Sequence, residues 1–496
     1  MGTASCVDDR KTMSSSRTGK SAEIRNRLEH PVIDADGHQI EFEPALLDHL
    51  DRVGGPSLAK RFKTWGDESL FRWYRATPDE RQDRRIHRIT WWGMPTKNTL
   101  DRATASLPKL YYDRLDEIGI DFSVIYPTFG LPVPHIEDEE LRRGACRAFN
   151  NFYAETYAEF ADRMCAVALV PMHTPHEAIE ELEYAVRELG LKAAMLAGYV
   201  RRPIEAIVRD APGSASDAVW LDTFCLDSRY DYDPVWAKCE ELKINPTFHS
   251  TGFGWGSRTS TSNYVYNHIG MFAAANEALC KALFLGGVTR RFPNLKFAFL
   301  EGGVGWACGL YADLYGHWEK RNLESLENYN PANLDRDLMA KLYRESGGRM
   351  VEGRLDQLDA MLGILASMRE QPEMLDEFAS CRIDRPEDVH DLFVPRFYFG
   401  CEADDPMNSL AFNRALNRQG ARLNTLFGSD IGHWDVPEVS RVLEEAYELV
   451  EDSLITEEDF RDFVFANPVT FFTSSNPEFF DGTVVEQSAR ETIARD

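Results

Sequence analysis

The sequence lacks paired cysteines and long apolar runs. Its nine cysteines are scattered singly, without a CxxC pair, so neither a disulfide framework nor a zinc–thiolate site is expected. No apolar run approaches the length of a membrane span, and no apolar segment near the N-terminus precedes a small-residue cleavage site. These absences predict a protein of the reducing cytoplasm that has no membrane partner.

Basic residues are also scarce. The chain has 55 Lys and Arg against 81 Asp and Glu, which gives a formal net charge of −26. An acidic balance of this size argues against nucleic acid as a partner and against an anionic membrane surface. Solubility is the simplest explanation of the acidity.

The chain is long enough for a large core. It has 496 residues, of which 43% are hydrophobic. Because α/β barrels of this length form single domains, we expect one elaborated domain over residues 29–475. Residues 1–28 are polar and aperiodic, which predicts a disordered leader, and residues 476–496 are expected to be a C-terminal tail.

Short apolar runs, most of them separated by helical sequence, dominate the domain. The predicted strands are Val32–His38, Phe122–Phe129, Met164–Pro171, Lys192–Gly198, Ile244–His249, Lys296–Leu300, Phe397–Cys401 and Thr425–Ser429. Repeated strand–helix order predicts parallel strands joined by right-handed crossovers, and this number of strands predicts a closed (β/α)8 TIM barrel of the α/β class. A doubly wound open sheet is the alternative.

Helix signals and two insertions complete this pattern. Thr174-Pro175-His176-Glu177 is a capping signal, with Glu177 completing a capping box. Residues 43–110 are dense in aromatic residues but have no clean period, so we expect an irregular lid or oligomer contact. Residues 307–395 are charged and predict a long helical insertion.

Polar side chains end several of the predicted strands, where the functional groups of barrel enzymes lie. Asp36 and His38 stand at spacing i, i+2 on the first strand, so both point to one face. The other strand ends carry His249, Glu301, Glu402 and Asp430. Such groups would repel and desolvate one another without a cation, and this donor set suits iron, manganese or zinc rather than copper(I).

Each of these positions also has a structural explanation. A histidine at a strand end is often only hydrogen-bonded, Glu301 before Gly-Gly suits a helix cap, and Asp430 suits an N-cap. His268 suits a packed histidine at a helix start, and His433 suits a group that orients Asp430 or contacts substrate. Tryptophans close to these motifs are expected to wall the pocket or to pack in the core: Trp255, Trp306 and Trp434.

Four blocks carry a resemblance to a known family. They are Val-Ile-Asp-Ala-Asp-Gly-His at 32–38, Pro-Thr-Phe-His at 246–249, Arg-Phe-Pro-Asn-Leu running into Phe-Leu-Glu-Gly-Gly-Val-Gly-Trp at 291–306, and Gly-Ser-Asp-Ile-Gly-His-Trp-Asp at 428–435. In this order they resemble the amidohydrolase-related branch of the metal-dependent hydrolase superfamily. The resemblance implies a TIM barrel with metal at its mouth and these ligands: Asp36, His38, His249, Glu301 and Asp430.

Two departures from the family pattern bear on the reaction. The family usually has His-x-His on the first strand and His on the sixth, where this chain has Asp36 and Glu301. Lys192 stands at the entrance of the fourth strand rather than at the end where binuclear hydrolases place a bridging lysine. A carboxylate-rich set resembles the nonheme dinuclear-metal monooxygenase subgroup, which implies Fe/Fe or Fe/Mn. Candidates for the second metal are His268, Glu402 and His433.

The first hypothesis is therefore an oxygen-activating monooxygenase that hydroxylates an unactivated carbon of a small organic acid or its activated ester. It would need dioxygen and an electron donor, and we expect it to be a homo-oligomer. The catalytic candidates are Asp430, His433 and Glu402. The alternative is a mononuclear zinc or manganese hydrolase or nonoxidative decarboxylase, in which Asp430 is the general base or the proton donor. A non-catalytic partner subunit is a third, less favoured class.

Overall fold

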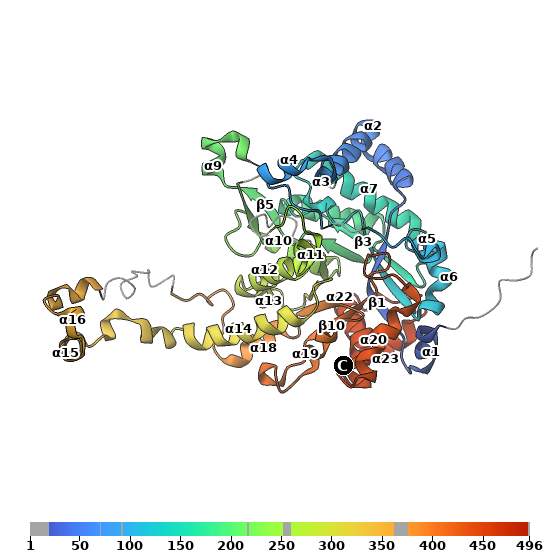
Figure 1. The fold of residues 1–496 in the computed structure, drawn as a ribbon. Helices are drawn as coiled ribbons and strands as arrows, with labels where there is room; N and C mark the ends of the chain where they lie inside the picture. Colours follow the sequence, from blue (N-terminus) through green and yellow to red (C-terminus); the bar gives the residue numbers. More distant parts are fainter. Residues whose placement is uncertain are drawn as a thin grey trace, which may run out of the picture.

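Eight parallel strands close into a barrel around an apolar interior (Figure 1). The computed structural model describes residues 19–69, 71–90, 93–215, 218–250, 259–361 and 375–494. The order around the barrel is β1-β10-β9-β8-β7-β4-β3-β2. The barrel strands are β1 (Ile33–Gln39), β2 (Phe122–Pro127), β3 (Met164–Val170), β4 (Ala193–Leu196), β7 (Pro246–Phe248), β8 (Phe297–Phe299), β9 (Phe397–Glu402) and β10 (Asn424–Gly428). The predicted barrel is confirmed, and the open sheet is excluded.

The first and last strands of the barrel meet, and this seam has an irregular register. β1 pairs with β10 through Asp36 and Gly428, and its register against β2 shifts between Asp34 and Gly37. A Cβ atom at Gly37 would lie 2.3 Å from Ser123 Oγ. A bulge of this kind re-aims the side chains that follow it, and here it is built around a residue that must be glycine.

Helices cover the barrel in the order that the strand–helix pattern predicts. They include α7 (Glu139–Tyr157), α8 (Pro175–Glu183), α10 (Asp233–Glu241), α12 (Met271–Leu285), α14 (Gly305–Arg321), α18 (Pro386–Phe393), α20 (Val442–Glu451) and α22 (Asn467–Ser475). The predicted cap of α8 is present, because the Thr174 side chain accepts from Glu177 N. Glu177 does not close the box: its carboxylate binds the buried guanidinium of Arg142.

The segment 43–110 is more regular than its sequence predicts. It begins with a long helix, α2 (Glu43–Ser69), which packs against α7 and bends at Gly55, where φ is 73°. Shorter helices follow: α3 (Arg72–Arg75), α4 (Pro78–Asp83), α5 (Thr99–Thr104) and α6 (Pro108–Ile118). Trp91 and Trp92 lie outside the described residues. The role of the segment as lid or oligomer contact stays a prediction.

The described part of the segment 307–395 is mostly helical, and its middle part extends away from the barrel. α14 runs outward, and α15 (Arg336–Ser346) and α16 (Gly348–Val351) lie at its far end (Figure 1). No residue of α15 is buried. The far end of this segment therefore lies outside the barrel core, whereas α14 and α18 contribute buried residues to it.

Both ends of the described chain pack onto the barrel more closely than expected. Residues 20–27 form a helix, α1 (Lys20–Arg27), which contacts α20 and leaves Ile24 only 1% exposed. Near the other end, Phe479 and Phe480 are buried and pack against Phe122 of β2, ahead of α23 (Glu486–Ile493). The expected leader is thus wrong for residues 20–27, and its residues 1–18 lie outside the described chain.

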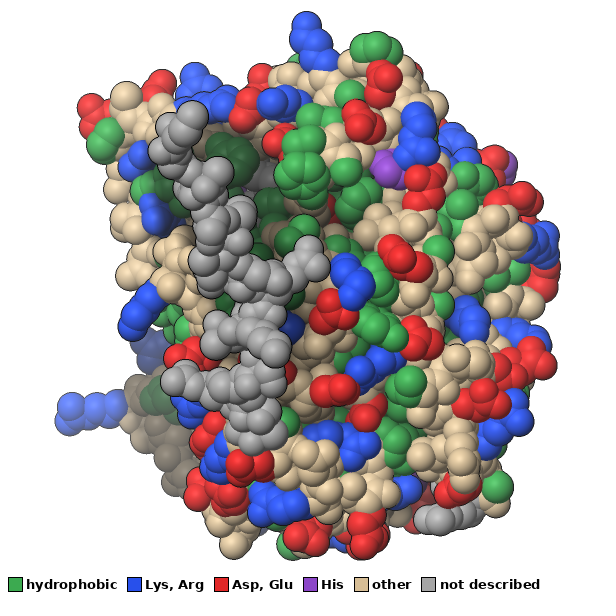
Figure 2. Space-filling model, turned by 90° about the vertical axis from the view of Figure 1, so that its right-hand side faces the viewer, with side chains coloured by type: hydrophobic (Ala, Val, Ile, Leu, Met, Phe, Trp, Pro, Cys, Tyr) green, Lys and Arg blue, Asp and Glu red, His purple; other side chains and the backbone are tan. Residues whose placement is uncertain are grey.

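One small sheet was not predicted. β5 (Val200–Pro203) and β6 (Val219–Asp222) pair antiparallel in a stretch whose sequence suggests only loops. Acidic and basic side chains alternate over the face drawn in Figure 2, and apolar side chains gather in a hollow in its upper part. Among the described residues, every helix is too short or too polar to cross a membrane.

Candidate metal centre

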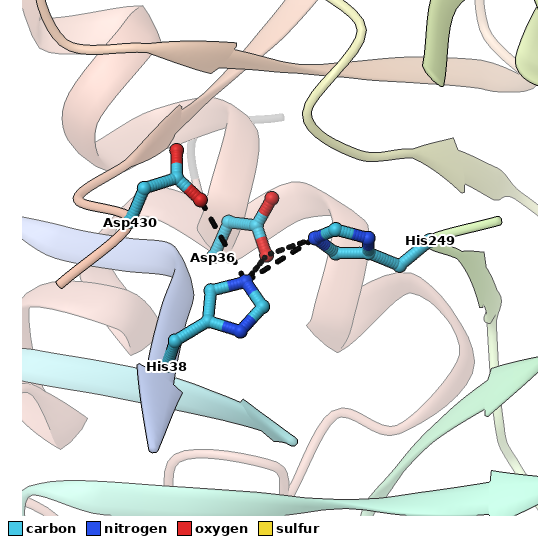
Figure 3. Close-up of side chains that lie close together, drawn as sticks. All are labelled: Asp36, His38, His249 and Asp430. Carbon is cyan, nitrogen blue, oxygen red and sulfur yellow. Dashed lines mark hydrogen bonds and ion pairs between the residues drawn. The ribbon is translucent and has the colours of Figure 1, made fainter. Parts of the chain in front are cut away.

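Four predicted ligands converge at one mouth of the barrel (Figure 3). Asp36 and His38 come from β1, His249 follows β7, and Asp430 follows β10. His38 Nε2 lies 3.2 Å from His249 Nε2, 3.4 Å from Asp36 Oδ1 and 3.6 Å from Asp430 Oδ1. Four donors placed about 2.0–2.1 Å from a single cation in tetrahedral geometry stand roughly 3.3–3.4 Å apart. The observed separations therefore match one metal ion.

A second group overlaps the first. Glu301 Oε2 lies 3.1 Å from His249 Nε2, and His433 Nδ1 lies 3.6 Å from Asp430 Oδ1 and 3.8 Å from Glu301 Oε1. Ligand atoms of His38, Glu301, Asp430 and His433 all lie within 4.8 Å of one another. Because His38 and Asp430 belong to both groups, the two groups form one connected centre.

Each carboxylate of this centre is buried and has one oxygen without a hydrogen-bond partner among the described residues. Asp36, Glu301 and Asp430 are 1%, 7% and 3% exposed, and Asp36 Oδ1, Glu301 Oε2 and Asp430 Oδ1 have no hydrogen-bond partner among the described residues. Burying a carboxylate oxygen in this way is costly unless a cation compensates for it. These orphaned oxygens fit a metal site.

The pKa values of these groups also reflect burial without a compensating positive charge. Burial raises the pKa of Asp36 to about 6. Burial, and then repulsion from neighbouring carboxylates, raises the pKa of Glu301 and of Asp430 well above the usual range. Burial lowers the pKa values of His38 and His249, which keeps both imidazoles neutral and able to bind metal. A cation among these groups would favour the ionised carboxylates.

Two of the acidic residues are held in an unusual backbone conformation. Glu301 has φ 50° and Asp430 has φ 47°, in the left-handed region that residues other than glycine rarely adopt. Behind Glu301, a Cβ atom at Gly302 would lie 2.8 Å from Asn276 Nδ2, and Gly303 has φ 65°. Strain of this kind concentrates at functional sites. The glycines after Glu301 thus provide a close backbone approach and a tight turn behind this residue.

A fully buried carboxylate beneath the centre fixes the ends of β1 and β10. Asp34 Oδ2 accepts from the hydroxyls of Ser429 and Ser123 at 2.7 Å each and from Tyr111 at 3.2 Å. Its Oδ1 accepts from Ser429 N at 3.0 Å and from Asp36 N at 3.2 Å. Asp34 therefore binds the candidate ligand Asp36 and Ser429, the neighbour of Asp430, a role that its sequence context does not indicate.

The remaining candidates lie farther from the two groups. Glu402 and His268 belong to neither group, but both line a cavity of about 280 Å³ beside Glu301, together with Asp405, Trp434 and Asp435. The second-metal role of His268 and the catalytic role of Glu402 stay predictions.

Trp434 walls this cavity, as suggested. Trp306 packs in the core against Phe299 and Phe399, and Trp255 lies outside the described residues. Lys192 is at the entrance end of the barrel, where its ammonium donates to Phe479 O. Asp435, which ends the block at 428–435, also lines this cavity, but its sequence context does not mark it as a site residue.

Comparison with known proteins now defines the family. The profile of the family described as amidohydrolase matches residues 48–330, which is more than half of the chain. The chain belongs to the amidohydrolase family. His249 and Glu301 fall inside the matched part, whereas β1 and β10 flank it.

Individual relatives are more distant. Decarboxylase orsB of Emericella nidulans is 28% identical over 166 residues, which cover 31% of this chain and 42% of that protein's length. An amidohydrolase of Mycobacterium avium subsp. paratuberculosis has a solved structure with a TM-score of 0.52 and 18% identity, covering 90% of this chain and 100% of the other. A dihydroxybenzoic acid decarboxylase of Polaromonas, solved with manganese and an inhibitor, has a TM-score of 0.48 and 15% identity, covering 91% and 99%.

Proposed function

We propose that this amidohydrolase-family chain is a nonoxidative decarboxylase of a small organic acid that works with one divalent metal ion, manganese or zinc. The observation that carries the proposal is the set of four donors from Asp36, His38, His249 and Asp430, which are spaced for a single cation. Support for the reaction comes from the Emericella relative, which is a decarboxylase by name. The proposal thus favours the alternative of the sequence analysis over the monooxygenase.

The reaction requires little of the protein beyond binding and one proton. A divalent metal ion supplies positive charge that binds and polarises the acidic group of the substrate. The carbon–carbon bond to the carboxylate breaks, CO2 leaves, and the carbon keeps the electron pair and takes up a proton. Asp430 is placed to hold that proton, and His433 Nδ1, 3.6 Å from Asp430 Oδ1, is placed to resupply it. Burial of all these groups excludes water from the step.

A hydrolase would use the same residues. Asp430 would then act as a general base toward water rather than as a proton donor to carbon. The two reactions differ in their products, because only decarboxylation releases CO2. Product analysis therefore separates them without any change to the protein.

A dinuclear oxygenase, with Fe/Fe or Fe/Mn, is the second candidate. The observation in its favour is that Asp430 and His38 belong to both ligand groups, and a shared carboxylate can bridge two metals. It would need dioxygen and an electron donor in addition to the organic substrate.

Metal content and gas exchange separate these candidates. Protein purified without added metal is analysed for bound metal and then assayed with a panel of small carboxylic acids under strict anaerobiosis. One manganese or zinc per chain with CO2 release supports the decarboxylase. Two irons per chain with substrate-dependent oxygen uptake would replace it by the oxygenase. His249→Ala should strongly lower either activity, whereas His317→Ala, on the exposed face of α14, should not.

A further inference from the structure

The cavity beside the metal centre has an acidic wall that the proposed reaction does not use. We call Glu402, Asp405 and Asp435 the acid wall; together with Glu301 they line a cavity of about 280 Å³. None of the described residues that line this cavity is Lys or Arg. Among the described residues, the wall therefore has no Lys or Arg inside the cavity to balance it, and His268 is the one imidazole there.

The neighbourhood of the acid wall adds more negative charge. Besides burial, the groups that raise the pKa of Glu402, to about 9, are Asp435, Glu301, Asp404 and Asp405. Asp435 Oδ1 is buried and has no hydrogen-bond partner among the described residues. Glu301, only 7% exposed, also lines this cavity, while its Oε2 lies 3.1 Å from His249 Nε2 in the metal centre. Carboxylates in this arrangement are stabilised when a positive charge enters the cavity.

The geometry favours an organic cation over a further metal ion. Among the described residues, two groups bring three or more ligand atoms within 4.8 Å, and the acid wall contributes to neither. Aromatic rings stand beside it instead: the Trp434 ring lies 5.9 Å from Tyr264 and 5.6 Å from His268. Separated carboxylates next to aromatic faces suit an ammonium group, which binds through charge and cation–π contacts and needs no tight ligand sphere.

We propose that the acid wall, with Trp434 beside it, binds a positively charged amine of the substrate. Glu301 links the two parts of the site, because it belongs to the second ligand group and also lines the cavity. In combination with the proposed function, on which this step rests, the substrate is an amino acid in the broad sense: a carboxylate at the metal centre and an ammonium group at the acid wall. A purely anionic acid would be repelled by the wall.

Ligand binding tests the proposal without turnover. Zinc-loaded protein is titrated with 4-fluorobenzylamine and, separately, with 4-fluorobenzyl alcohol, a neutral molecule of the same shape, and binding is followed by fluorine NMR. We expect the amine to bind at least about tenfold more tightly. Glu402→Gln and Asp435→Asn should each lower that preference several-fold, and the double variant should remove it. Glu438→Gln, an exposed residue near Asp435, should leave it unchanged.

The contrary outcomes separate a failure of the amine site from a failure of the proposed reaction. Equal binding of amine and alcohol, or a preference that survives in the folded double variant, would overturn the proposal. So would a second zinc ion per chain that is lost in Glu402→Gln, because the wall would then hold a metal. Failure of CO2 release with an intact amine preference would reject only the proposed reaction. Circular dichroism of each variant confirms that the barrel is folded.

Discussion

Asp34 and Asp36 are two buried carboxylates on the same strand, and they differ completely in their surroundings. They are 0% and 1% exposed. Asp34 accepts five hydrogen bonds, from Ser429, Ser123, Tyr111 and the backbone of Asp36. Asp36 Oδ1 has no hydrogen-bond partner among the described residues. Burial alone therefore does not mark a functional carboxylate; the number of donors that face it does.

The largest effect is expected from removing one of the candidate metal ligands, the set to which Asp36 belongs. His249→Ala should lower activity by about a thousandfold, because the metal's contribution of several kcal/mol to the transition state is lost. CO2 release and bound metal, measured together, check it, with His317→Ala as the control. Full activity without bound metal would show that the centre has another purpose.

The comparison itself predicts opposite changes in stability. Asp34→Ala should lower the free energy of unfolding by about 3 kcal/mol or more, because several buried donors lose their acceptor. In metal-free protein, Asp36→Ala should raise it by about 1–2 kcal/mol, because an uncompensated buried carboxylate is removed.

Urea unfolding of both variants without metal decides this prediction. Similar losses in the two variants would mean that Asp36 has donors as effective as those of Asp34.

Metal removal should lower stability by the binding free energy of the ligand set, to which Asp36 belongs. At a metal concentration one hundred times the Kd, wild-type protein should gain about 2.7 kcal/mol over chelator-treated protein. Asp36→Ala should gain much less, whereas Asn151→Ala, a half-buried residue of α7 that accepts from the Tyr184 hydroxyl, should gain as much as the wild type. Thermal unfolding with and without manganese measures the gain, and an equal gain in Asp36→Ala would remove that residue from the ligand set.

Glu41 is a third buried carboxylate, and it is intermediate between Asp34 and Asp36 in how fully hydrogen bonds satisfy it. It accepts from Phe129 N, Gly130 N and the Tyr153 hydroxyl, yet burial still raises its pKa to about 7 from 4.5. The folded state therefore holds this proton more tightly than the unfolded state. Its contribution to stability is complete below about pH 4.5 and is lost as the pH rises through 7, by at most about 1.4 kcal/mol per pH unit.

Urea unfolding between pH 5 and pH 8 tests this expectation. In Glu41→Gln the decline with pH should be shallower than in the wild type by that amount. Parallel profiles would mean that Glu41 keeps an ordinary pKa in the folded protein.

The sequence was most informative where side-chain chemistry coincides with strand ends. Five candidate ligands were found because Asp36, His38, His249, Glu301 and Asp430 end apolar runs, and parallel strands in a barrel bring such ends together. Asp34 escaped notice because residue type and spacing do not distinguish it from Asp36. The two residues are distinguished only by the donors from β2 and from the end of β10 that reach Asp34. Those contacts are set by the bulge at Gly37.

Other differences between the expected and the observed structure arise from packing contacts that leave no local pattern in the sequence. α2 appeared irregular because its apolar residues follow the surface of α7 across the bend at Gly55 rather than a single helical face. The β5–β6 hairpin contains Arg201, Arg202 and Pro203 and so lacks the apolar alternation of a typical strand. The acid wall is dispersed over the end of β9 and the loops after β9 and β10, and no spacing in the sequence links Glu402 to Asp435.

The pairing of β1 with β10 sets the order in which this protein can be assembled during translation. Asp34 and Ser429, which bond across that seam, are 395 positions apart in the chain. At a synthesis rate of ~5–20 residues per second, a ribosome needs roughly 20–80 s to make that interval. Throughout this time the nascent chain carries Asp36 and His38 without Asp430, so cofactor loading must be among the last events of its biogenesis.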